Sequence, residues 1–121
     1  MKITGIVSTL QVHDLDTAIQ FYINLGFELE WKWPDQNPSH ASIKSSGWSF
    51  MLEKIDSSIK PARADLYFRV ENVEDLHKSI EEKDVQNSGL QKTDYGMLDF
   101  SITSPNGHHL VFGEPSGEYQ G

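Results

Sequence analysis

The chain repeats one strand-to-helix junction, and this repeat constrains the fold more than any other feature of the sequence. Residues 10–27 begin with the end of an alternating apolar strand, and Asp14 follows at a position typical of a helix N-cap. Gly26 can take the left-handed backbone conformation that ends a helix. A shift of 58 positions carries Asp14 onto Asn72, and residues 68–76 repeat the pattern. The repeat indicates duplicated modules, neither of which buries its sheet alone. The alternative is a chance similarity of two junctions.

Each module is predicted to run strand, helix and three strands. Alternation and turn residues place strands at 3–12, 27–33, 39–45 and 48–55 in the first half, and at 65–71, 96–103 and 108–113 in the second. A second helix is expected at 73–83, and 85–93 is ambiguous. The strand at 27–33 alternates with Phe27, Leu29, Trp31 and Trp33 inward. We expect one domain of residues 1–121, with module one at 1–60, module two at 61–115 and a polar tail at 116–121.

Composition excludes several classes of protein. The formal charge of −8, from 18 acidic and 10 basic residues, repels the phosphates of nucleic acids. No apolar run is long enough to cross a bilayer, and Met1-Lys2-Ile3 leads directly into a strand rather than into a secretory signal. Cysteine is absent from the sequence, which removes disulfide and thiolate chemistry. We expect a cytoplasmic protein without a nucleic-acid or membrane partner.

Two motifs carry a family resemblance. Val-x-Asp-Leu-Asp-x-Ala-Ile-x-Phe-Tyr-x-x-Leu-Gly-Phe-Glu-Leu starts at Val12, and Ser-Pro-Asn-Gly-His-x-Leu-x-Phe-Gly-Glu-Pro ends at Pro115. With the tandem modules they resemble the vicinal oxygen chelate superfamily, which includes glyoxalase I, extradiol dioxygenases and bleomycin-resistance proteins. The resemblance implies an α+β fold in which two tandem βαβββ modules form a curved mixed sheet around a cavity. It does not specify a reaction.

The resemblance implies that the metal-ligand positions of the metal-using members correspond to Val7, Glu53, Asp65 and Val111 of this chain. A transition metal needs at least three imidazole, carboxylate or thiolate donors, and valine offers none. Glu53 and Asp65 would hold at most a weakly bound hard cation together with water. We therefore expect no metal and no other cofactor.

Strand parity predicts which side chains line the concave side, opposite the helices. His108 and His109 are adjacent and must point to opposite faces, so His40 and His109 are the histidines that can face a ligand. Aromatic planes and carboxylates attract planar rings and organic cations. The candidate ligand-binding residues are Gln11, Trp31, Trp33, His40, Met51, Glu53, Asp65, Tyr67, Arg69, Asp99 and His109. Two alternatives stay open: tryptophans that are core residues beneath the helix, and carboxylates that form structural ion pairs with Arg69, Lys44 or Arg63.

Bleomycin-resistance proteins resemble this picture most closely. The resemblance implies a metal-free homodimer that binds or sequesters a planar or cationic small molecule without catalysis, a basis for antibiotic resistance. One alternative is a glyoxalase-type lyase or isomerase in which Glu53 and Asp65 share a proton or hold a metal. Another is an interaction module with a vestigial pocket. The sequence is compatible both with modules paired in one chain and with modules exchanged between two.

Overall fold

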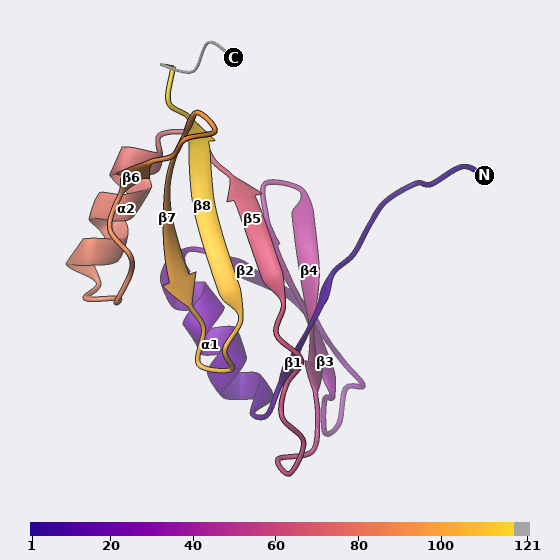
Figure 1. The fold of residues 1–121 in the computed structure, drawn as a ribbon. Coiled ribbons are helices and arrows are strands. Elements are labelled where there is room, and N and C mark those ends of the chain that lie inside the picture. Colours follow the sequence, from indigo (N-terminus) through magenta and orange to yellow (C-terminus); the bar gives the residue numbers. More distant parts are fainter. Residues whose placement is uncertain (118–121) are drawn as a thin grey trace. The chain divides into compact units, whose positions relative to one another are not determined.

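The computed structural model describes residues 1–117; the last four residues of the expected tail, 118–121, lie outside the described part. The chain divides into two compact units, Met1–Arg63 and a second that begins at Ala64. Each unit contains a four-stranded mixed sheet with one helix against one of its faces (Figure 1). This confirms the predicted α+β architecture of two tandem modules.

The first unit places its strands in the order β1-β4-β3-β2, with β1 parallel to β4 and the other pairs antiparallel. Helix α1 covers one face, where Leu10, Ile43 and Leu52 are fully buried. Burial of such side chains is the main stabilising contribution of this unit. The elements are β1 (Thr9–Val12), α1 (Leu15–Leu25), β2 (Glu28–Trp33), β3 (His40–Ser45) and β4 (Trp48–Lys54).

Local signals define both ends of helix α1, as predicted. The Asp14 side chain accepts a hydrogen bond from the backbone N–H of Thr17 at 2.9 Å, and this bond lowers the pKa of the Asp14 carboxyl from its ordinary value. Gly26 takes φ 116° and donates its backbone N–H to the Ile23 carbonyl at 3.0 Å. The helix therefore begins and ends where the sequence indicates.

The first strand is shorter than predicted. Residues 1–8 have no regular structure, and Ile3, Ile6 and Val7 are exposed where the segment runs away from the sheet (Figure 1). Strand β1 lies at the edge of its sheet, and a hydrogen bond from the Met51 N–H to the Ser8 carbonyl extends its pairing by one residue. Because an edge strand has one neighbour, the residues before it gain few hydrogen bonds.

The second unit repeats this topology in the order β5-β8-β7-β6, with β5 parallel to β8. Phe112 stacks between Phe68 and Phe100 on the face that helix α2 covers. The ambiguous segment 85–93 contains a two-residue strand. The elements are β5 (Asp65–Arg69), α2 (Val73–Glu82), β6 (Gln91–Lys92), β7 (Met97–Thr103) and β8 (His109–Pro115).

The cap of helix α2 differs from the prediction. Asn72 takes a left-handed conformation with φ 56° and makes no side-chain capping bond. The Glu114 carboxylate of β8 accepts hydrogen bonds from the backbone N–H groups of Val73 at 2.9 Å and Asn72 at 3.1 Å instead. A carboxylate with its full charge satisfies these amides and interacts favourably with the helix dipole, whereas the amide side chain of Asn72 is neutral.

Within residues 1–117, neither helix has the length and apolar character needed to span a bilayer.

Candidate functional site

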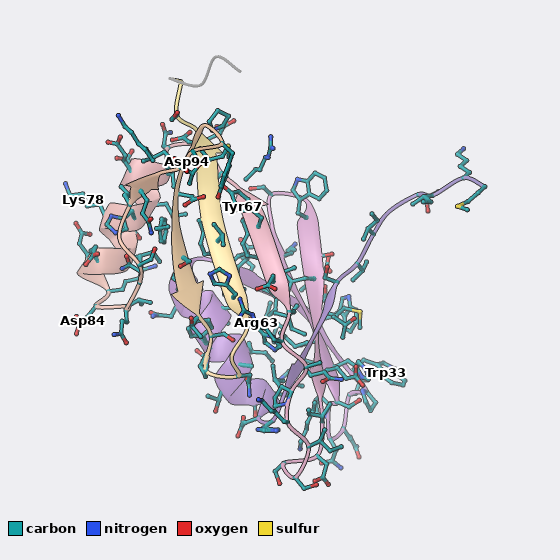
Figure 2. The ribbon with its side chains drawn as sticks, in the orientation of Figure 1. Trp33, Arg63, Tyr67, Lys78, Asp84 and Asp94 are labelled. Atoms are coloured by element: carbon teal, nitrogen blue, oxygen red, sulfur yellow. The ribbon has the colours of Figure 1, made fainter. Side chains whose placement is uncertain are left out.

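A bulge in strand β2 decides which way the two neighbouring tryptophans point. Leu29 pairs with Ile43 on the helix side of the sheet, and the next pair is Trp31 with Ser42, so Glu30 is an extra residue. From the bulge onward Trp31 and Trp33 lie on the open face, opposite α1, where they are 42% and 62% exposed. Figure 2 shows Trp33 projecting away from the sheet. The alternation that placed both tryptophans inward is therefore wrong, and they are not core residues.

Two side-chain contacts support the bulged register. Lys32 lies on the helix side, with its Nζ 3.9 Å from the Asp16 Oδ1 on α1. On the open side, the Ser42 hydroxyl donates to the Glu30 Oε1 at 2.7 Å, and Ser42 is buried. A hydrogen bond to a charged carboxylate in a partly buried place is among the stronger kinds, so this contact stabilises the bulge.

The register of the first sheet aligns its predicted site residues in two rows on the open face. In the first row, Glu53 lies between its partners Gln11 and His40, and His40 pairs with Trp33 at a ring-centroid distance of 6.1 Å. The second row runs Thr9, Met51, Ser42 and Trp31. All six predicted site residues of this unit therefore share one face: Gln11, Trp31, Trp33, His40, Met51 and Glu53.

The polar members of these rows differ in how they are engaged. The Gln11 Oε1 accepts the backbone N–H of Ala62 at 2.8 Å and so anchors the segment at the end of the first unit. The His40 Nδ1 lies 2.8 Å from the Ser39 hydroxyl. Within the described part of the chain, the Glu53 carboxylate takes part in no hydrogen bond or ion pair. Glu53 is therefore the anionic group of this face that remains open to a ligand.

The second sheet brings together the other five predicted site residues. Asp65 pairs with His109, and the Asp65 Oδ1 lies 3.3 Å from the His109 Nδ1. His108 points to the opposite face, where it is buried and its Nδ1 accepts the Ala64 N–H at 3.0 Å, which confirms the predicted parity of the two histidines. The rows on this open face are Asp65, His109 and Thr103; Tyr67, Val111 and Ser101; and Arg69, Gly113 and Asp99.

Asp99 forms a cluster with two tyrosines. The hydroxyls of Tyr67 and Tyr95 donate to the Asp99 Oδ2 at 2.9 and 3.1 Å. Burial and then the bond to Asp99 raise the pKa of Tyr67, and the bond to Asp99 raises the pKa of Tyr95. Tyr67 reaches Asp99 across Gly113, where an added Cβ would collide with the Tyr67 hydroxyl and lie 2.7 Å from the Asp99 Cβ. Sequence reasoning missed Tyr95 because it stands in a turn, outside any strand alternation.

The four positions at which metal-using relatives would carry ligands do not form a donor set here. Val7 is exposed ahead of β1, and Val111 stands in β8 between Tyr67 and Ser101. Two of the four side chains are hydrocarbon, so the residues present do not fit a divalent transition metal. Within residues 1–117, no three His, Asp or Glu side chains gather closely enough to hold a metal ion.

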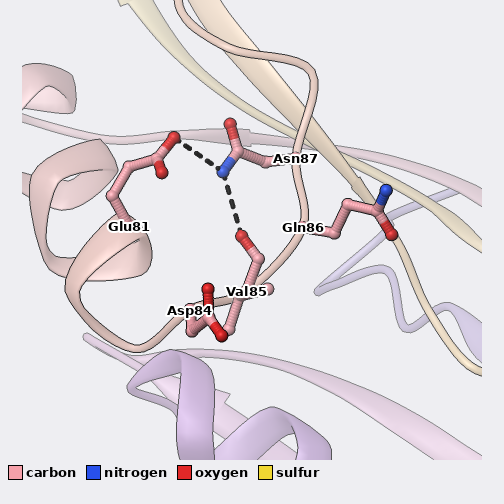
Figure 3. A pocket seen from close by; sticks show the side chains of 5 residues that line it. All are labelled: Glu81, Asp84, Val85, Gln86 and Asn87. Atoms are coloured by element: carbon pink, nitrogen blue, oxygen red, sulfur yellow. Dashed lines mark hydrogen bonds between the residues drawn. The ribbon is translucent and has the colours of Figure 1, made fainter.

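Two surface hollows lie elsewhere in the second unit. The larger, of about 390 Å³, is lined by Glu81, Asp84, Val85, Gln86 and Asn87 after helix α2 (Figure 3). There the Asn87 amide donates to the Glu81 Oε1 at 3.1 Å and to the Val85 carbonyl at 3.0 Å. The other is lined by Asn72, Glu74, Asp75 and Glu114. Neither hollow contains a predicted site residue. The lining residues lie at the two ends of α2.

The fold defines a protein of two βαβββ modules, in each of which the helix covers one face of the sheet. A model of the Glyoxalase/Bleomycin resistance protein/Dioxygenase superfamily matches residues 4–112. The chain belongs to this superfamily.

Solved structures share the fold at low sequence identity. A bleomycin resistance determinant encoded on the transposon Tn5 has a TM-score of 0.78 and 12% identity, over 93% of this chain and 98% of that one. A bleomycin-binding protein in complex with bleomycin has a TM-score of 0.74 and 13% identity, over 93% and 98% of the two chains. Lactoylglutathione lyase from Agrobacterium tumefaciens has a TM-score of 0.74 and 18% identity, over 99% and 100%. A search of curated protein sequences found no significant match.

Proposed function

We propose that the protein binds a planar or cationic organic molecule on the open face of its first sheet, without a metal ion and without catalysis. The observation that carries this proposal is the β2 bulge, which presents Trp31 and Trp33 on the same face as the unengaged Glu53 carboxylate. Indole rings bind planar rings and cations through their faces, and a carboxylate adds attraction for positive charge. The net charge of −8 favours the approach of a cation.

The relatives support a sequestering role. Two structures with this fold are a bleomycin resistance determinant and a bleomycin-binding protein, the second in complex with bleomycin. In this chain the valines at two of the ligand positions are consistent with binding that needs no metal. A protein that sequesters a toxic compound in this way would confer antibiotic resistance.

Tryptophan fluorescence tests the proposal, because the chain has three tryptophans and two of them lie on the proposed face. The purified protein is titrated with planar cations such as proflavine, and with bleomycin, before and after treatment with a chelator. We expect Trp33→Ala to weaken binding about tenfold, a loss of about 1.4 kcal/mol. We expect Glu53→Gln to weaken the binding of cations more than that of neutral planar compounds.

Trp48→Ala is the matched control. Trp48 is 82% exposed at the start of β4 and has the strand parity of the buried Phe50, so its loss removes an exposed indole away from the open-face rows. The Trp48→Ala variant should bind the titrated compounds with the affinity of the unmodified protein. Equal losses from Trp33→Ala and Trp48→Ala, binding that requires a metal, or no binding by any compound would contradict the proposal.

We also propose that the protein acts as a homodimer in the cytoplasm. Small two-module chains of this superfamily commonly form dimers. The exposed apolar residues ahead of β1 offer a surface that a second copy would cover. Sedimentation at micromolar concentration tests this assembly, and a monomer would contradict it.

The Asp65–His109 contact favours a second candidate, a glyoxalase-type lyase. A carboxylate 3.3 Å from one imidazole nitrogen orients the ring, leaving the other nitrogen able to take a proton beside a carbonyl group. This activity would exchange solvent deuterium into that carbon, and His109→Gln would abolish the exchange. Stoichiometric zinc, nickel, manganese or iron in protein purified without chelator would favour this candidate over the first.

A further inference from the structure

The second unit contains a carboxylate that is held by hydroxyl groups and not by a cation. Asp99 is 7% exposed and accepts both of its hydrogen bonds, from Tyr67 and Tyr95, on Oδ2. No Lys, Arg or His of residues 1–117 lies within ion-pair distance of it. Arg69, the cation in the same row, stands on β5, two strands away from Asp99. A buried negative charge without a counter-ion is costly, so a cation that reached Asp99 would be stabilised there.

One oxygen of Asp99 remains free to accept a hydrogen bond. Oδ1 accepts none from the described residues, yet it is not fully enclosed by protein. The raised pKa values of Tyr67 and Tyr95 keep both phenols protonated and neutral. The cluster therefore combines one anionic acceptor with two neutral aromatic hydroxyls.

The cluster is accessible from the open face of the second sheet. Tyr67 and Tyr95 are 42% and 61% exposed. Helix α2 covers the other face, where the rings of His77 and Phe100 have centroids 5.1 Å apart. In Figure 2 Tyr67 lies near the upper end of this sheet. A ligand can thus reach the two tyrosine rings without displacing the helix.

We propose that Asp99, Tyr67 and Tyr95 form a site for a protonated amine. An ammonium N–H donates to the Asp99 Oδ1, and the carbon next to the nitrogen lies against the exposed tyrosine rings, which attract positive charge. Gly113 is part of this site, because only a residue without a side chain leaves room for Tyr67 to cross β8 and reach Asp99. The site goes beyond the proposed function of the first sheet, since it lies in the other unit and is built from one carboxylate and two phenols.

Titration with cyclohexylamine, which is protonated at neutral pH, tests the site, with neutral cyclohexanol as its matched probe. Two-dimensional amide NMR spectra of the whole protein would follow the signals of Asp99 and Gly113. We expect the amine to shift these signals and the alcohol to leave them unchanged. Asp99→Asn keeps an oxygen that accepts the tyrosine hydroxyls but removes the charge, and we expect it to weaken amine binding about tenfold.

Asp35→Asn is the control for charge alone, because it makes the same change in net charge at an exposed loop residue of the first unit. It should leave cyclohexylamine binding at Asp99 unchanged. Equal binding of amine and alcohol, undiminished binding by Asp99→Asn, or an equal loss from Asp35→Asn would overturn the proposal. If Asp99→Asn does not fold, Tyr95→Ala replaces it, since that side chain is exposed and its loss should also weaken amine binding.

This test and the tryptophan titration report on different units. Amine binding at Asp99 is followed by amide signals of the second unit, whereas the tryptophan titration reports on the first. A negative result here with ligand binding at Trp33 would overturn the amine site alone.

Discussion

The Glu114 carboxylate on β8 accepts a hydrogen bond of 2.9 Å from the backbone N–H of Val73 and thereby caps helix α2 from a neighbouring strand. A second bond, from the N–H of Asn72 at 3.1 Å, completes the cap. The Gly-Glu-Pro end of the last strand thus serves the fold by fixing the start of a helix to the sheet that it covers.

Glu114→Ala should lower the free energy of unfolding by about 1–2 kcal/mol, because it leaves two amides of the first turn without a protein partner. Chemical denaturation measures this loss. Asp14→Ala, which removes the cap of α1, is the matched comparison and should also lower the free energy of unfolding. An unchanged midpoint for Glu114→Ala would show that water replaces the carboxylate without cost.

Gly113→Ala should destabilise the protein by about 1–3 kcal/mol, since the new Cβ would lie 2.7 Å from the Asp99 Cβ and collide with the Tyr67 hydroxyl. In a Tyr67→Phe background the cost should be smaller, because the colliding oxygen is gone. Gly5→Ala, with open space around its Cβ, serves as the control and should have little effect. Equal costs with and without the hydroxyl would contradict the predicted coupling.

Tyr67 and Tyr95 should lose their protons at higher pH than free tyrosine, whose pKa is about 10. Because folding raises these pKa values, the resulting stabilisation is complete below the unfolded pKa and decreases as the pH rises above it. Ultraviolet absorbance of tyrosinate, or NMR of assigned tyrosines, follows the titration. Asp99→Asn should bring the Tyr67 pKa down, and a Tyr67 titration that does not respond would contradict the assigned cause.

Ser42→Ala should destabilise the protein by about 1 kcal/mol, because it removes the buried hydroxyl that donates to the exposed Glu30 carboxylate at the β2 bulge. It should also weaken the binding of planar ligands, since Trp31 follows the bulge and loses its fixed orientation. Denaturation and tryptophan fluorescence titration measure the two effects. Ser49→Ala, an exposed serine on the same face, is the control, and equal effects from both serines would count against a role for the bulge.

Features with local causes were predictable from the sequence. Helix α1 is delimited by an acceptor three residues before its donor, Asp14 to Thr17, and by the backbone of Gly26. Strand parity also placed the candidate residues of the second sheet on one face and separated His108 from His109, because the period of two holds in β5 and β8. These interpretations need no knowledge of distant residues.

Features that depend on residues distant in the sequence were not predictable. The residues of β2 alternate without interruption, so hydrophobicity favoured buried tryptophans. The bulge instead accompanies a contact between Glu30 of β2 and Ser42 of the adjacent strand β3, which alternation does not reveal. Asn72 had a sequence typical of a helix cap, and a carboxylate 41 residues away from Val73 took its place. Tyr95 reaches Asp99 through a turn whose geometry the residue types do not define.

The extra residue in β2 has a consequence for how relatives of this protein are compared. A homologue that lacks a counterpart of Glu30 would pair its strand regularly and still direct the counterparts of Trp31 and Trp33 outward, because a bulge absorbs one inserted residue without rotating the rest of the strand. Aligning such a homologue without a gap at position 30 would match solvent-facing side chains of one protein with helix-facing side chains of the other. Ligand specificity inferred from that alignment would be assigned to the wrong positions.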